Sequence, residues 1–257
     1  MKSLQHEVTS EPSESSNPSM DTGAIHEAIV ERVEQLTPLV TQMTLQPQGF
    51  TPRYRPGQWI ELHLPAEDGS VRRRAYYLAE APAEAAGLTI VFDHPAKSET
   101  PLRLAGLEVG DTISWSGPAG TFALPNPLEV ELVWVARDMG IVPFRCMARA
   151  LPTHRLTSHI HLICGFNNLD YAPFHREFLD RSVMDPNFDY TPVALSPIEG
   201  WGGAIGSELN VLRQFSPNWN PDHVAMICGE QAFTEPIRAF FAESPAQPVR
   251  SVQFEGY

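Results

Sequence analysis

The segment Arg72–Tyr77 (RRRAYY) concentrates side chains that could bind a ligand. The guanidinium of Arg74 is a planar fork of donors that can pair with a phosphate through two hydrogen bonds. Tyr76 and Tyr77 offer flat rings with a polar end, against which a planar group can stack. A basic edge strand with two half-buried tyrosines is the alternative, and the segment alone does not decide between the two.

A strand that runs into a helix is the second candidate. Residues 131–136 (ELVWVA) form a continuous apolar run, which is typical of a strand buried on both faces of a parallel sheet. Gly140 follows, and Pro143 takes the first-turn position that proline favours in helices. Free N–H groups at the start of such a helix can bind an anion such as phosphate.

Cysteine and histidine do not indicate a metal centre. The three scattered cysteines, Cys146, Cys164 and Cys228, cannot hold an iron–sulfur cluster or a four-cysteine zinc site, and they imply no set of disulfides. His159 and His161 share a face of a predicted strand, but no third ligand can be identified by spacing. We therefore predict no metal site.

Composition limits the classes of protein that could carry these groups. The 257 residues have a formal net charge of -13, which disfavours general binding to nucleic acid or to anionic membranes. No apolar run is long enough to span a membrane. Residues 1–24 are rich in Ser, Glu and Pro and lack the apolar core of a secretory signal, so they are predicted to be a disordered tail. We expect a cytoplasmic protein without membrane insertion.

The pattern along the chain changes character near residue 127. Residues 25–127 alternate short apolar segments with Gly, Pro and Asp turns, which predicts an antiparallel barrel or sandwich. Residues 128–257 alternate strands and helices, which predicts a parallel sheet covered by helices. In this second part the expected strands are 131–136, 159–166, 189–197, 223–229 and an edge strand at 249–257, and the expected helices are 142–151, 173–182, 207–215 and 233–244.

Seven short strings occur in an order that resembles the ferredoxin–NADP reductase family, including its oxygenase-reductase and flavohaemoglobin-like members. They are YRPGQW, RRRAYY, GPAG, MGIVPF, WGGAIG, CGE and the terminal FEGY, and the resemblance spans residues 25–257. It implies a two-domain β plus α/β fold. An FAD-binding antiparallel β-barrel at 25–127 would precede a doubly wound, parallel-sheet NAD(P)-binding domain at 128–257. GPAG, residues 117–120, is expected to be a hairpin turn of structural importance.

The resemblance also implies roles in flavin binding. Arg74 would bind the flavin phosphates and Tyr76 would contact the isoalloxazine ring. Lys97 and Ser98 lie in the segment that would approach the pyrophosphate, although the glycines usual there are missing. Tyr77 stands where family members carry a small hydroxyl residue near flavin N5. Its phenol could block the hydride path, or its hydroxyl could still reach N5.

The resemblance implies that Cys228 and Glu255, together with Tyr77, assist catalysis and that Gly229 and Tyr257 contact the cofactors. Cys228, followed by Gly229, would place a thiol beside the nicotinamide ring, and a buried core cysteine is an equally good interpretation. The terminal Glu255-Gly256-Tyr257 resembles the Glu-x-Tyr of plastid-type reductases. There Tyr257 would cover the flavin face and Glu255 would help the proton and electron steps. Alternatively, these last residues are only the end of an edge strand and have no role in catalysis.

The dinucleotide-binding turn departs from the family pattern. Gly140 and Pro143 are kept, but residues 137–139 read Arg-Asp-Met where the family usually has Gly-Gly-Thr. Three side chains thus occupy space that the family leaves to the ligand, and one is acidic. Asn167 replaces a frequent arginine, so a preference for NADP is not supported, and Glu230 replaces the usual proline after Cys-Gly.

Two functions follow from these observations. The first is a flavin-dependent oxidoreductase or electron-transfer component with FAD as cofactor. It would pass electrons between NAD(P)H and a separate redox partner, such as a ferredoxin, haem or oxygenase component. The second is a ferredoxin-reductase-like subunit or binding module that has lost nicotinamide binding and serves as an electron relay, interaction or regulatory component. The substituted turn argues against tight NAD(P)H binding and so points to the second function. The motifs as a whole favour the first, and that is the function we predict, with ordinary nicotinamide reductase activity in doubt.

Overall fold

The computed structural model describes most of the chain. The described residues are 23–66, 68–82, 87–93, 104–126, 128–151, 158–215, 223–243 and, by backbone alone, 249–255. Residues 1–22 of the expected tail lie outside these ranges, as do Lys97, Ser98 and Tyr257. None of the helices in the described part is long and apolar enough to cross a membrane.

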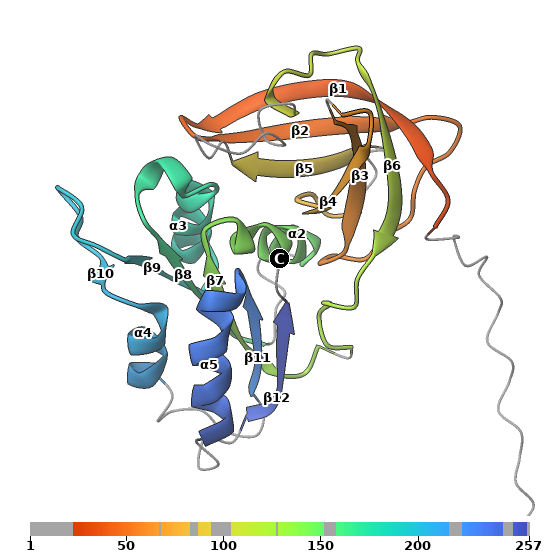
Figure 1. The fold of residues 1–257 in the computed structure, drawn as a ribbon. Helices are drawn as coiled ribbons and strands as arrows, with labels where there is room; N and C mark the ends of the chain where they lie inside the picture. The colour runs from red at the N-terminus through yellow and green to blue at the C-terminus, as the bar shows by residue number, and fades with distance from the viewer. Residues whose placement is uncertain are drawn as a thin grey trace, which may run out of the picture.

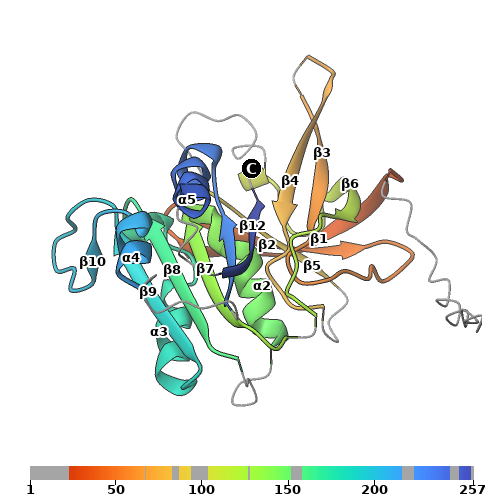
Figure 2. The ribbon, with the colours of Figure 1, turned by 90° about the horizontal axis from the view of Figure 1, so that it is seen from below.

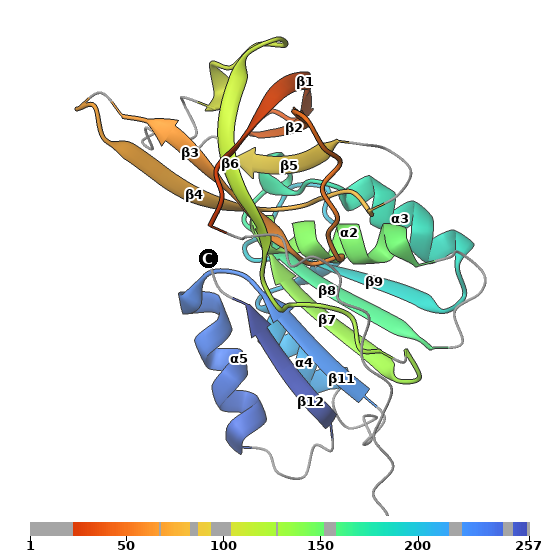
Figure 3. The same cartoon turned by 90° about the vertical axis from the view of Figure 1, so that its right-hand side faces the viewer.

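The N-terminal half forms a six-stranded antiparallel sheet that curls into a barrel (Figures 1 and 3). The strand order is β4-β3-β6-β1-β2-β5, and a bridge between Leu78 and Ile90 joins the two edges, β4 and β5. Alternate residues such as Ile60 and Leu62 are fully buried in the barrel core. The strands are β1 (His26–Thr37), β2 (Val40–Pro47), β3 (Trp59–Pro65), β4 (Val71–Tyr77), β5 (Leu88–Asp93) and β6 (Thr112–Ala119).

The prediction of a hairpin turn at residues 117–120 was wrong. Gly117, Pro118 and Ala119 are the last residues of β6, where its pairing with β3 shifts register. Gly120 follows with φ of 102°, and a Cβ there would lie 2.8 Å from Nε1 of Trp59. The motif therefore ends a strand and lets the chain pass close to the Trp59 ring, so its glycine is required by packing.

The C-terminal half forms a parallel sheet of six strands in the order β10-β9-β8-β7-β11-β12. Helices α2 and α3 cover one face and α4 and α5 the other (Figure 1). This confirms the predicted β plus α/β fold. The elements are β7 (Glu131–Arg137), β8 (Ile160–Phe166), β9 (Phe188–Ala194), β10 (Ala204–Ile205), β11 (His223–Cys228), β12 (Val249–Glu255), α2 (Val142–Ala150), α3 (His175–Met184), α4 (Glu208–Phe215) and α5 (Gln231–Glu243).

Side chains of β7 alternate between the two faces of this sheet. Trp134 and Ala136 lie in the core beneath α2 and α3, whereas Val133 and Val135 lie in the core beneath α4 and α5. A strand covered on both faces needs apolar residues at every position, which explains its continuous apolar run. The edge strand is β12, as predicted, while the two-residue β10 and the short 3-10 turns Asp138–Ile141 and Leu169–Tyr171 were not predicted.

A cluster of four charged residues joins the two halves. Arg145 of α2 is buried and pairs with Glu80 of the barrel and with Glu177 of α3, each at 2.8 Å. Arg149, one turn further along α2, pairs with Glu80 at 2.8 Å. The Arg145 guanidinium also donates to the carbonyl of Ala79. This Arg145 cluster holds the start of α2 under the barrel, between the two sheets (Figure 1).

Replacing Arg145 by Met should lower the free energy of unfolding by about 2 to 3 kcal/mol, because Glu80 and Glu177 lose their buried counter-charge. Arg149→Met is the matched control on the same helix. Its side chain is 47% exposed, against 8% for Arg145. It should therefore cost less than about 1 kcal/mol. Urea denaturation with equal m-values measures both, and equal losses would contradict the role given to Arg145.

Candidate functional site

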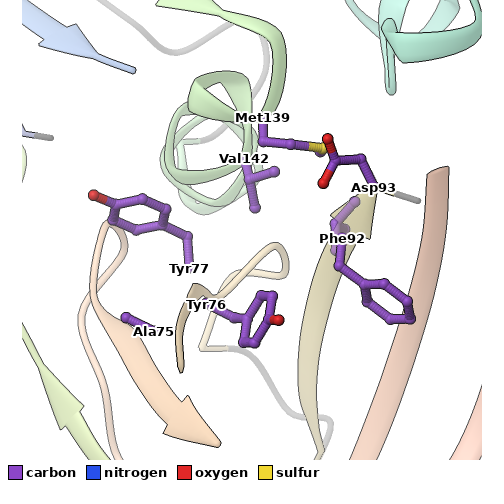
Figure 4. Close-up of a pocket in the computed structure, with 8 residues that line it drawn as sticks. Ala75, Tyr76, Tyr77, Phe92, Asp93, Met139 and Val142 are labelled. Carbon is purple, nitrogen blue, oxygen red and sulfur yellow. The ribbon is translucent and has the colours of Figure 1, made fainter. Parts of the chain in front are cut away.

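A pocket lies between the open edge of the barrel and the start of α2 (Figure 4). Its volume is about 130 Å³. Strands β4 and β5 form two of its sides next to the Leu78–Ile90 bridge, and the residues that enter α2 form the third. We call it the interdomain pocket; it is lined by Ala75, Tyr76, Tyr77, Val91, Phe92, Asp93, Met139 and Val142.

The two tyrosines of β4 point to opposite sides of the strand. Tyr76 pairs in register with Ile60 and packs against the barrel core, with its ring edge-on to Phe92 at 6.4 Å. Burial raises the pKa of Tyr76 to about 12, so its hydroxyl stays protonated at neutral pH. Tyr77 packs instead against the core that α2 shares with the parallel sheet. Figure 4 shows the two rings diverging from the pocket wall.

Arg74 lies on the same side of β4 as Tyr76, because residues two apart share a face of a strand. Its side chain is exposed, and its Nη1 donates to the carbonyl of Arg73 at 2.9 Å. Arg73 lies on the opposite face, 3.8 Å from Glu61. The structure thus brings Arg74, Tyr76 and Tyr77 together at one strand, with a cation beside the tyrosines that line the pocket.

The C-terminal ends of β7 and β11 meet at Gly140. A Cβ on Gly140 would lie 2.1 Å from the carbonyl oxygen of Cys228, so only glycine fits. Pro143 is in the first turn of α2, as predicted. Cys228 is fully buried in the core, Gly229 follows it, and the backbone of Glu255 lies beside Cys228 in the β11–β12 register. The catalytic roles of Cys228 and Glu255 stay predictions.

The side chains of residues 137–139, which lead from the end of β7 into the turn, point in three different directions. Met139 lines the interdomain pocket near Asp93 (Figure 4). Asp138 faces Asn167, whose Nδ2 donates to it at 3.4 Å. Arg137 points to the α4 and α5 side and forms a two-pronged ion pair with Glu208, with N–O distances of 2.9 and 2.5 Å.

Sequence reasoning missed Glu208. This first residue of α4 is 1% exposed, and its carboxylate lies against Gly165 at the end of β8. A Cβ on Gly165 would lie 1.7 Å from Oε1 of Glu208, so the glycine makes room for the carboxylate. The available signals were an acid in the first turn of a predicted helix, where the helix dipole favours it, and a glycine at the end of a predicted strand.

Asp138 combines a strained backbone with a partly unsatisfied carboxylate. Its φ is 46°, in the left-handed region that non-glycine residues rarely adopt. Its buried Oδ1 has no hydrogen-bond partner among the described residues. The pKa of Asp138 is raised to about 6, mainly by burial and to a smaller extent by Glu208 and Glu230, while Asn167 and Arg137 oppose the rise.

Histidine does not form a metal centre in the described part of the chain, where no group of three His, Cys, Asp or Glu side chains could hold an ion. His161 instead pairs with the hydroxyl of Thr191 at 2.8 Å and lies edge-on to Phe215. Burial lowers the pKa of His161 to about 4, so the ring is neutral at physiological pH. His161 thus has a packing role.

Asp138→Asn should stabilise the protein in a pH-dependent way. Because folding raises this carboxyl pKa from 3.8 to about 6, the folded protein holds a proton there that the unfolded chain has lost, and stability falls as pH rises across that window. The variant should gain about 1 to 2 kcal/mol over the wild type at high pH and little at low pH. Urea denaturation at about pH 4 and about pH 8 measures this, and a pH-independent difference would contradict it.

Several curated proteins of similar sequence are named as reductases or electron transfer components. The reductase component 2 of terephthalate 1,2-dioxygenase from Comamonas sp is 27% identical over 199 residues, covering 75% of this chain and 56% of that protein. The toluate 1,2-dioxygenase electron transfer component of Pseudomonas putida is 24% identical, covering 87% and 65%. Ferredoxin–NADP reductase B of Sorangium cellulosum is 29% identical, covering 62% and 63%. The chain therefore spans less than two thirds of the length of these relatives.

Solved structures with the same arrangement cover nearly the whole chain. A ferredoxin–NADP reductase from Neisseria gonorrhoeae with bound FAD and NADP is 20% identical with a TM-score of 0.76, covering 90% of this chain and 98% of that one. The flavohem-like FAD/NAD-binding domain of a Vibrio cholerae nitric oxide dioxygenase is 18% identical with a TM-score of 0.74 and the same coverage.

No family model matches the chain. The solved structures nevertheless match the combination of an antiparallel, barrel-like sheet with a helix-covered parallel sheet. The resemblance inferred from the sequence is confirmed at the level of the fold. The chain has the ferredoxin–NADP reductase-like fold of flavohaemoprotein-type FAD- and NAD-binding reductases.

Proposed function

We propose that the chain is a flavin-dependent electron-transfer component. It would bind FAD at the interdomain pocket and pass electrons from a reduced nicotinamide dinucleotide to a separate redox protein. The observation that carries this is the pocket itself, where two tyrosines of β4 line the wall and Arg74 lies on the same strand. When bound, FAD supplies the redox chemistry, while the protein supplies orientation and electrostatics.

The residues present fit a flavin. Tyr76 and Tyr77 offer aromatic surface, and Val91 and Val142 add apolar walls suited to a fused ring system. The exposed guanidinium of Arg74 can take two phosphate oxygens. Met139 and Val142, at the start of α2, form one wall of the pocket, and the Arg145 cluster keeps α2 in that position.

Under this proposal the electrons leave the flavin for an acceptor outside these 257 residues, which we propose to be a separate protein. The chain has only three cysteines, and all are free and buried, so it cannot carry an iron–sulfur cluster of its own. Relatives are named as reductase or electron transfer components of oxygenase systems, which supports an oxygenase component, a ferredoxin or a haem protein as partner. Free buried cysteines also support the cytoplasmic location that we include in the proposal.

The domain boundary at residues 127–128 is part of the same proposal. The barrel strands end at Ala119 and the parallel sheet begins at Glu131, which supports a boundary in the connecting segment. The flavin half would be residues 25–127 and the dinucleotide half residues 128–257. The interdomain pocket uses side chains from both halves.

The absorption spectrum of the purified protein, followed by anaerobic titration with NADH and NADPH, tests the function. A flavin spectrum that bleaches with either nucleotide supports the proposal. A flavin spectrum that neither nucleotide changes would favour the alternative function, an electron relay that has lost nicotinamide binding. The Arg137–Glu208 ion pair at the end of β7 is the observation that supports this alternative. A colourless protein that does not bind added FAD would overturn the assignment of a flavin cofactor.

Arg74→Ala should weaken FAD binding roughly 10- to 100-fold, because a charge-assisted phosphate contact is worth about 1.5 to 3 kcal/mol. Arg73→Ala is the matched control, since Arg73 neighbours it on the opposite face of β4. The control should leave FAD affinity within about twofold of the wild type. Titration of each apoprotein with FAD, monitored by the visible absorption spectrum of the flavin, gives the FAD dissociation constants of both variants. Unchanged flavin retention in Arg74→Ala would refute its role.

A further inference from the structure

The C-terminal edge of the parallel sheet has a topological switch point between β7 and β11. From β7 the chain builds β8, β9 and β10 on one side (Figure 2) and then returns to add β11 and β12 on the other (Figure 1). In open α/β sheets, ligands bind in the crevice beyond the carboxyl ends of the strands at such a point. Here that crevice lies between Arg137, which ends β7, and Gly229, which follows β11.

In this chain a side-chain ion pair fills that end of β7. Arg137 and Glu208 are joined by two hydrogen bonds of 2.9 and 2.5 Å, and the Arg137 guanidinium lies over the ring of Phe233 at 4.7 Å. Glu208 is 1% exposed and rests against the backbone of Gly165. The pair therefore occupies the ends of β7 and β8 from within the protein.

The charge at this edge also disfavours phosphate. Arg137 is neutralised by Glu208, while Asp138 and Glu230 contribute further negative charge close to it. A pyrophosphate brought here would meet more carboxylates than cations. Phosphate sites of this fold class depend on free backbone N–H groups and on close approach of the ligand to glycines, and both need this space to be open.

We propose that the Arg137–Glu208 ion pair closes the dinucleotide-phosphate position from within, so that reduced nicotinamide dinucleotides bind this chain only weakly. Within this pair, Glu208 is the residue that determines the weak binding of the dinucleotide. The inference rests on the proposed function for its ligand class, since a dinucleotide is the electron donor proposed there. It does not depend on whether flavin is bound.

Glu208 also predicts how the turn must be changed to admit a dinucleotide. Replacing Arg137, Asp138 and Met139 by Gly, Gly and Thr removes the partner of a fully buried carboxylate. An unpaired buried charge is strongly unfavourable, and it would still repel phosphate. The turn and Glu208 must therefore be changed together.

Isothermal titration of the full chain with NADH and NADPH tests the proposal. The combined variant R137G/D138G/M139T/E208Q should bind a dinucleotide at least about tenfold more tightly than the wild type. The triple variant that retains Glu208 should gain little affinity and unfold at lower urea concentration. Glu208→Gln alone keeps the side-chain shape, so it guards against misfolding of the larger variant, and it should bind about three- to tenfold more tightly than the wild type.

Glu27→Gln is the charge-matched control, since Glu27 is exposed on β1 of the barrel, and its affinity should equal that of the wild type. Wild-type binding as tight as that of the combined variant would overturn the proposal. Equal affinities of the wild type, the Glu208→Gln variant and the combined variant for NADH and NADPH, with all three proteins folded, would also overturn it. The visible spectrum of each sample reports the flavin separately, so a failure of the flavin assignment is distinguishable from a failure of this inference.

Discussion

The buried guanidinium of Arg145 is the constraint on which the geometry of the site depends. A cation removed from water needs counter-charges with good geometry, and here Glu80 comes from the barrel and Glu177 from α3. The three groups can be satisfied together only when α2 lies under the barrel. That position places Val142 at the base of the interdomain pocket and Met139 beside it. The pocket thus exists because charge compensation fixes one helix between two sheets.

The barrel contributes the other half of the pocket through an incomplete closure. Its edge strands β4 and β5 are bridged at Leu78 and Ile90, and the pocket lies beside that bridge. Strand alternation then distributes the side chains of β4: Arg74 and Tyr76 share one face, and Tyr77 takes the other. A single strand can therefore offer a cation and aromatic surface to one ligand while still packing against the core.

Much of the fold could be predicted from the sequence, because burial patterns are local. The continuous apolar run of β7 indicated a strand covered on both faces, and Pro143 indicated the start of α2. The site was harder to predict, since its key contacts join distant residues. Nothing in the sequence near Glu208 shows that it pairs with Arg137, 71 positions earlier. The register shift that makes residues 117–119 part of β6 likewise depends on β3, far earlier in the chain.

The turn after β7 shows how a fold can persist while its ligand-facing residues change. Gly140 is fixed by the carbonyl of Cys228, which leaves no space for a side chain whether or not a ligand binds. No backbone atom excludes side chains at residues 137–139 in this way, and the three side chains point in three directions, although Asp138 does so with a strained backbone and an unsatisfied carboxylate oxygen. Packing of Gly140 therefore fixes the backbone of this turn whether or not a ligand binds there. Glu208 and Gly165 then form a second, mutually dependent pair, because the carboxylate needs the glycine for space and Arg137 for charge.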